Sequence, residues 1–187
     1  MALLYAAKLT PSKAELISTW LPTRRWFGRP AATARPVAAY RFDDPDGEVG
    51  MESHLLEVDG ELLHVPVTYR AAELPGAREW LIGTMEHSVL GTRWVYDAPG
   101  DPVYRGELAR VIREADTQVR LFVQKAEGLV EREPTLRVRG SGEVADGQNQ
   151  IVVVRRPLTD QPVASAATLR GTWAGQDEPV VLAYLTA

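Results

Sequence analysis

The residues best suited to chemistry in this chain are three histidines, His54, His64 and His87, because imidazole binds metal ions and acts as a general base near neutral pH. Ser53 precedes the first and Ser88 follows the last, which places a hydroxyl nucleophile next to a base in sequence. The spacing supports neither use, since there is no His-Glu-x-x-His motif and no Gly-x-Ser-x-Gly elbow. The absence of cysteine excludes thiolate metal sites. We therefore predict no catalytic, metal-binding or cofactor-binding residues.

Motifs for phosphate chemistry are incomplete. Gly140-Ser141-Gly142 is a lone Gly-x-Gly, and neither the dinucleotide fingerprint nor the P-loop is completed around it. A kinase needs a lysine that positions the nucleotide, but none of the three lysines (Lys8, Lys13 and Lys125) stands in a strand of that type. A glycosidase pair cannot be identified among the acids of residues 43–61, which are better explained as turns and solvated strand faces.

Composition describes an ordinary globular protein of 187 residues, with 45% apolar and 25% charged side chains. A formal net charge of -4 argues against a dedicated nucleic-acid binder. No uncharged run approaches the roughly 18 residues that a membrane span requires. The apolar start, residues 1–7, is short and lacks a preceding basic region, so it does not resemble a signal peptide. We expect a soluble cytoplasmic protein with one domain, or one domain and an extension.

A helix is predicted to begin near Ser12, whose spacing to Glu15 is that of a capping box. Leu16, Ile17 and Trp20 then recur at helical spacing, and Pro22 is expected to end the helix near Leu21.

The strongest strand signal is a hairpin formed by residues 51–58 and 61–69 around Asp59-Gly60, a dipeptide that suits a two-residue turn. Such a turn pairs Val58 with Glu61, Leu56 with Leu63 and His54 with Val65 on one face. Leu55 and His64 then lie on the other face. The two histidines are therefore predicted to point away from each other.

The remaining elements give an α+β chain. Asp101-Pro102 is predicted to start a second helix that runs to Ala115 or beyond, with a pattern that continues through Val123. We predict loops at residues 140–147 and 158–165, and a turn beside Asp177 and Glu178 before the last strand. Strands are expected at residues 37–42, 80–84, 93–96, 136–138, 151–154, 169–173 and 180–185.

A basic, proline-containing loop is predicted at residues 24–36, and its aromatic pair, Trp26 and Phe27, is equally compatible with core packing and with an exposed contact patch. With Arg24 and Arg25 this pair is our predicted contact for a partner or ligand. Aromatic side chains are concentrated in the first 104 residues, and since sugar sites use exposed aromatic faces, a carbohydrate surface is an alternative.

Several short segments, in their order and spacing, resemble the N-terminal cap of maltokinases over residues 8–115. They are Trp20-Leu21-Pro22, Arg25-Trp26-Phe27, Val65 to Arg70, Leu81 to Thr84, Trp94 to Asp97, and Asp101-Pro102. The chain is also similar to stand-alone actinobacterial cap-like proteins, some of which carry a 1,4-alpha-glucan branching label. That label implies a barrel of about 200 to 250 residues, which 187 residues cannot hold.

The resemblance implies a cystatin-like cap, in which a curved antiparallel sheet packs on an N-terminal helix. It divides the chain into a cap-like region, residues 1–125, and a β-rich extension, residues 126–187, packed on the same domain. Maltokinases phosphorylate maltose with ATP in the trehalose-to-glycogen pathway. Their catalytic and metal-binding residues lie in later lobes and have no matching positions here.

These observations lead to a first hypothesis of a non-catalytic cap-like module that binds a protein partner, or regulates enzymes of glucan or trehalose metabolism, through Arg24, Arg25, Trp26 and Phe27. A small carbohydrate-binding protein is the second hypothesis. An unrecognised enzyme of sugar metabolism is the third, and it requires a concave pocket with convergent polar groups.

Overall fold

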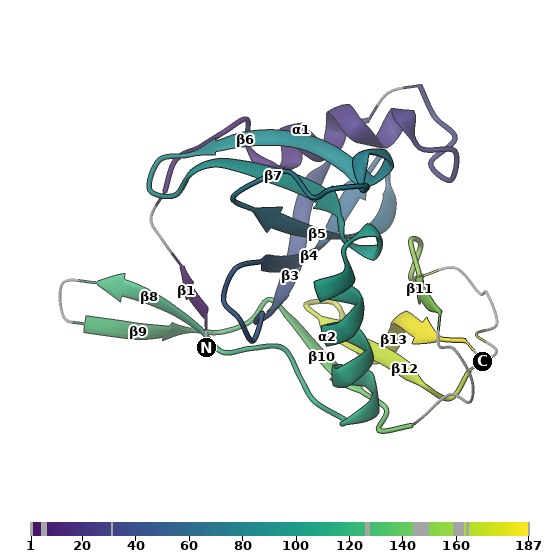
Figure 1. The fold of residues 1–187 in the computed structure, drawn as a ribbon. Helices are drawn as coiled ribbons and strands as arrows, with labels where there is room; N and C mark the ends of the chain where they lie inside the picture. Colours follow the sequence, from purple (N-terminus) through teal and green to yellow (C-terminus); the bar gives the residue numbers. More distant parts are fainter. Residues whose placement is uncertain are drawn as a thin grey trace.

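The computed structural model describes residues 2–4, 7–30, 32–125, 128–143, 150–158, 163 and 165–186. At its centre lies a six-stranded antiparallel sheet in the order β2-β6-β7-β5-β4-β3, which curls around helix α1 (Lys13–Trp20) (Figure 1). Its strands are β2 (Leu9–Thr10), β3 (Arg35–Phe42), β4 (Gly50–Val58), β5 (Glu61–Arg70), β6 (Leu81–His87) and β7 (Gly91–Asp97). The predicted α+β class with a curved sheet on an N-terminal helix is confirmed.

Helix α1 forms as its sequence predicts. The Glu15 amide donates to the Ser12 hydroxyl at 3.3 Å, and the Ser12 amide donates to the Glu15 carboxylate at 2.8 Å, which completes the capping box. Leu16, Ile17 and Trp20 are buried against the inner face of the sheet. After Trp20 the chain continues as a single 3-10 turn that contains Pro22.

The predicted β4–β5 hairpin is confirmed in its register as well as its position. Val58 pairs with Glu61, His54 with Val65, and Leu55 with His64. Asp59 and Gly60 both have positive φ, 52° and 82°, as a type I′ turn requires. His54 therefore faces α1, whereas His64 faces the opposite side of the sheet.

The outer face of the central sheet is covered by helix α2 (Pro102–Arg113) and a four-stranded sheet in the order β10-β12-β13-β11 (Figure 1). The strands of this second sheet are β10 (Leu136–Gly140), β11 (Ile151–Val153), β12 (Thr168–Trp173) and β13 (Gln176–Leu185). One hydrophobic cluster joins the three layers, with Leu55 from the central sheet, Leu108 from α2, and Leu136 and Leu182 from the second sheet. The C-terminal strands therefore share a core with the cap-like strands.

The second helix is shorter than predicted. It ends at Arg113, because Ala115 adopts a left-handed conformation with φ 54° and the Asp116 amide donates back to the Val111 carbonyl at 3.0 Å. This 6→1 hydrogen bond is the Schellman arrangement that terminates helices. The apolar pattern that continues through Val123 belongs instead to a strand, β8 (Leu121–Lys125).

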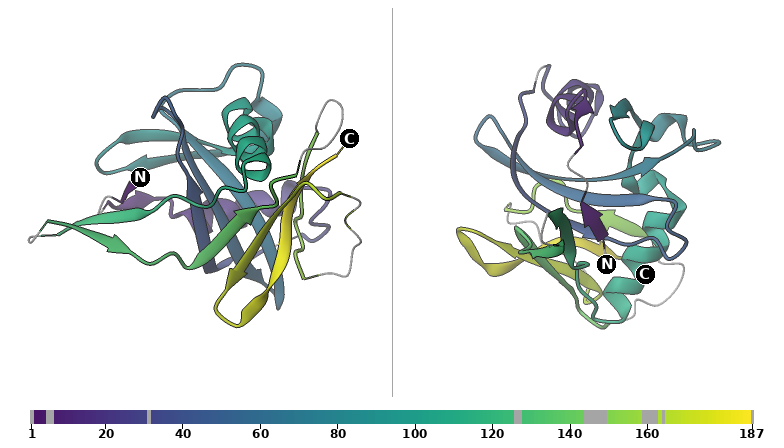
Figure 2. Two further views of the ribbon diagram at one scale, coloured as in Figure 1. Left: turned by 90° about the horizontal axis from the view of Figure 1, so that it is seen from below. Right: turned by 90° about the vertical axis from the view of Figure 1, so that its left-hand side faces the viewer.

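Strands β8 and β9 (Gly128–Arg132) form a hairpin that projects from the body of the molecule, and β1 (Ala2–Leu4) runs parallel to β8 (Figure 2). This small sheet was not predicted from the sequence. The turn that was predicted beside Asp177 and Glu178 was also misplaced, since it lies at Ala174-Gly175 and both acids are part of β13. Of the predicted loops, residues 144–149, 159–162 and 164 lie outside the described residues.

No helix in the described part of the chain has the length and apolar character needed to cross a bilayer.

Candidate functional site

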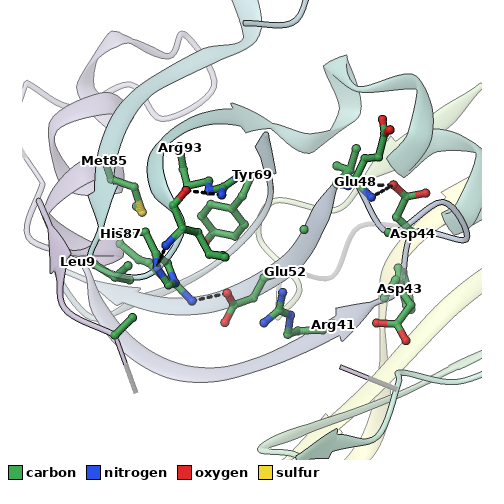
Figure 3. Close-up of a pocket in the computed structure, with 17 residues that line it drawn as sticks. Leu9, Arg41, Asp43, Asp44, Glu48, Glu52, Tyr69, Met85, His87 and Arg93 are labelled. Atoms are coloured by element: carbon green, nitrogen blue, oxygen red, sulfur yellow. Dashed lines mark hydrogen bonds and ion pairs between the residues drawn. The ribbon is translucent and has the colours of Figure 1, made fainter. Parts of the chain in front are cut away.

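A pocket of about 510 Å³ opens on the inner face of the curled sheet, beside the first turn of α1 (Figure 3). Its walls come from both ends of the sheet, from the segment that leads into α1, and from the turns that follow β3 and β6. The residues that contribute to it are Ala7, Leu9, Lys13, Arg41, Phe42, Asp43, Asp44, Gly47, Glu48, Val49, Gly50, Glu52, Tyr69, Met85, His87, Leu90 and Arg93.

The carboxylate of Glu52 on β4 is largely buried, with only 12% of its side chain exposed. Lys13, on the first turn of α1, donates its ammonium group to this carboxylate in a short ion pair. Behind them, His54 Nε2 lies 3.9 Å from the Glu52 carboxylate and 3.2 Å from the Tyr69 hydroxyl. The helix and three positions on adjacent strands thus hold one connected polar cluster.

Burial and charge fix the protonation states in this cluster. Burial works to raise the pKa of Glu52, but neighbouring positive charge and the hydrogen bond from Lys13 outweigh it and lower that pKa. Burial lowers the pKa of His54 to about 4, so the imidazole is neutral at pH 7. Burial also raises the pKa of Tyr69 well above its ordinary value.

The Tyr69 ring stands in the middle of the pocket, between cationic side chains. The Lys13 ammonium group lies 5.4 Å from the ring centroid. Arg41 comes from β3 on one side and Arg93 from β7 on the other (Figure 3). Space above the ring exists because β4 begins with Gly50, where a Cβ atom would lie 3.4 Å from the ring and 3.6 Å from Arg41 Nη2. A larger side chain there would fill the pocket.

Two turns form the rim. In the first, the Asp44 carboxylate accepts the amides of Asp46, Glu48 and Val49 at 3.1, 3.0 and 2.8 Å, which fixes the turn after β3. In the second, His87 Nδ1 accepts the amides of Val89 and Leu90 at 3.2 and 3.1 Å. The rim is therefore held by its own hydrogen bonds.

Most of the residues that line the pocket lie in a segment that matches a known protein family. Residues 20–101 match the family model of the maltokinase N-terminal cap domain. This segment is therefore similar to the N-terminal cap domain of maltokinases. The match covers somewhat less than half of the chain, and no curated protein matches the sequence.

The matched segment, residues 20–101, runs from the end of α1 to Asp101, the N-cap residue of α2, and contains β3 to β7. It supplies Arg41, Glu52, Tyr69 and Arg93 to the pocket. Lys13 lies outside it, on the preceding helix.

The predicted contact residues lie elsewhere, on the turn after α1. Phe27 is only 2% exposed and belongs to the core under α1, and Trp26 is half-buried at 6.1 Å from the Trp20 ring. Arg24 is partly buried against Trp20, with its guanidinium 5.4 Å from that ring, so Arg25 is the one exposed member of the predicted set.

Two arginines from the C-terminal part hold this turn. Arg156 donates to the carbonyl oxygens of Trp26 and Phe27 at 2.8 and 3.3 Å, and to the Glu61 carboxylate at 2.6 Å. Arg155 lies over the Trp26 ring at 4.9 Å. The turn is thus a rigid part of the fold, and whether it contacts a partner stays a prediction.

The chemistry available in the pocket is recognition by charged groups around an aromatic ring. Among the described residues, no group of three or more histidine, aspartate or glutamate side chains is placed to hold a metal ion. The third hypothesis required a concave pocket with convergent polar groups and shifted pKa values, and the structure contains one. The same features serve ligand binding, which requires no nucleophile.

Proposed function

We propose that the cap-like region is a binding module for a small polar ligand, and that this ligand is a carbohydrate seated in the pocket between Glu52, Tyr69 and Arg93. The single observation that supports this proposal is the pocket of about 510 Å³, in which Lys13 and Glu52 hold each other and the rim turns are closed by their own hydrogen bonds. Its volume lies within the range of about 300 to 1,000 Å³ that small-molecule sites occupy.

The pocket suits a sugar because it offers both kinds of hydrogen-bonding group around an apolar surface. Hydroxyl groups donate and accept, so they can donate to the Glu52 carboxylate and accept from Lys13 or the two arginines. Tyr69 supplies an aromatic face, and Met85 and Leu9 extend the apolar surface beside it. The side chains of Lys13 and Glu52 already hold each other in an ion pair, so ligand binding loses little side-chain entropy at these two residues.

Calorimetry with maltose, trehalose and soluble glycogen at millimolar concentration tests this proposal. We expect saturable binding of at least one of these ligands to the wild-type protein, and none to Gly50→Val, because the added methyl groups would occupy the space beside the Tyr69 ring. Gly50→Ala is the matched control, since its single Cβ atom fits at ordinary contact distance, and it should retain binding. Absence of heat with every ligand, or equal binding by Gly50→Val, would count against the proposal.

A second candidate function is contact with a protein partner, such as an enzyme of glucan or trehalose metabolism. It is favoured by the exposure of Arg25 on a turn whose backbone Arg156 holds in place, because a preordered loop loses little entropy on binding. Pull-down from native lysate should recover a specific protein with the wild-type chain and lose it with Arg25→Ala. Recovery of the same proteins by both chains would exclude this turn as the contact.

A further inference from the structure

The inner part of the pocket carries more positive than negative charge. The Lys13 ammonium group lies 5.4 Å from the Tyr69 ring centroid. Figure 3 shows Arg93 beside Tyr69 and Arg41 beside Glu52, with the other labelled acids on another side of the pocket. Lys13 is already paired with Glu52. Within the part of the chain that the structure describes, neither Arg41 nor Arg93 forms an ion pair. Three cations therefore share one carboxylate, and the inner pocket keeps an excess of positive charge.

Both arginines also have unsatisfied donors. The Nε atoms of Arg41 and Arg93 are shielded from solvent and have no hydrogen-bond acceptor among the described residues. Arg93 uses one Nη2 bond on the Leu90 carbonyl, and Arg41 Nη2 lies in the space over Gly50 and Tyr69. A buried donor without an acceptor costs free energy that a suitable ligand would recover.

The acids at the rim do not neutralise Arg93, because they lie on another side of the pocket. The Asp44 carboxylate is engaged by three amides of its own turn, and Glu48 is an exposed residue. Figure 3 places Asp43, Asp44 and Glu48 together on one side of the pocket, apart from Tyr69 and Arg93. Burial and the charges of Arg93 and Lys13 also lower the pKa of His87 at the rim.

From this charge imbalance we propose that the ligand of the pocket carries a carboxylate or phosphate group, which binds against Arg41 and Arg93 on the two sides of Tyr69. The inference rests on the proposed function and specifies its ligand. Oxyanions are the partners that a planar guanidinium binds best, because its donors match two oxygens at once. Partial enclosure by low-dielectric walls strengthens the attraction over its value in water.

Matched ligands separate this inference from the proposed function. We would titrate glucose, glucuronate, glucose 1-phosphate and inorganic phosphate into the full chain at low salt. Glucuronate or glucose 1-phosphate should bind at least about tenfold more tightly than glucose. The preference should decline as salt is added, because screening weakens the attraction.

Variants then assign the effect to the two arginines. Arg41→Gln and Arg93→Gln should each weaken binding of the acidic sugar by a larger factor than binding of glucose, and Arg93→Lys should keep most of the preference. Arg170→Gln on the exposed side of β12 is the matched control and should change nothing. Thermal melting of each variant shows whether it is folded, so loss of binding in a folded variant is interpretable.

Each outcome is decisive. If glucose, glucuronate and glucose 1-phosphate bind with equal affinity, the inference is overturned but the proposed function is not. Inorganic phosphate that binds as tightly as glucose 1-phosphate supports an oxyanion site and overturns sugar recognition. If none of the four ligands binds, and maltose, trehalose and glycogen also give no binding heat, both the inference and the proposed function are overturned.

Discussion

Replacing Gly140 by alanine is expected to lower the free energy of unfolding by more than about 4 kcal/mol, or to prevent folding altogether. A Cβ atom at this position would lie 2.0 Å from the Val111 carbonyl oxygen and 2.7 Å from the Ile112 Cα atom. Both contacts are backbone atoms of α2, so no side-chain rotation can relieve them. The helix or strand β10 would have to move, at the expense of the core that they share.

Gly106→Ala provides the matched control for this prediction. Gly106 lies on the exposed side of the same helix, and a Cβ atom added there would meet nothing within 4 Å. Alanine is a better helix former than glycine by about 1 kcal/mol, so this variant should be slightly more stable than the wild type. Urea denaturation of both variants gives the comparison. A Gly140→Ala protein as stable as the wild type would mean that α2 and β10 do not approach as closely as described.

Acidification is the second large effect that we expect. Burial, with Arg155 nearby, lowers the pKa of His64 to about 3, and burial lowers that of His54 to about 4, against an ordinary value of 6.5. The unfolded chain therefore binds two protons below pH 6.5 that the folded chain does not. Stability that is present above pH 6.5 is lost as the pH falls toward 4.

The size of the acid effect follows from proton linkage. Each histidine contributes about 1.4 kcal/mol per pH unit, so the free energy of unfolding should fall by roughly 5 kcal/mol between pH 6.5 and 4. Glu52 adds to the loss below pH 4.5, because its carboxylate is stabilised in the folded state. Denaturation midpoints measured from pH 7 to pH 4.5 test this, and His64→Gln should remove about half of the slope. A flat profile would show that the two imidazoles are not buried as described.

Local signals accounted for the elements that were predicted correctly from the sequence. The Ser12 and Glu15 capping box, the alternation of β4 and β5, and the Asp59-Gly60 turn each act within a few residues, so the chain specifies them before tertiary packing. The same locality explains the error after α2. An apolar pattern through Val123 is compatible with a helix or a strand, and the choice depends on the left-handed Ala115 and on pairing with β9.

The pocket could not be predicted because it joins distant segments. Lys13 and Glu52 are 39 residues apart, and Arg41 meets Glu52 only through the register of β3 on β4. One signal was present in the sequence: the predicted hairpin register places Glu52 and His54 on the same face as Leu56 and Val58. Two polar groups on a buried face indicate a functional or structural cluster. The aromatic content instead directed attention to Trp26 and Phe27, which serve the core.

The most direct test of ligand binding in the pocket is an amide NMR titration of the full chain with maltose and, separately, with glucuronate. We expect saturable shifts that are concentrated at Gly50, Glu52, Tyr69 and Arg93, with the turn around Arg25 unchanged. Shifts confined to that turn, or no shifts with either ligand, would contradict the claim that this protein acts by binding a small polar molecule inside its curled sheet.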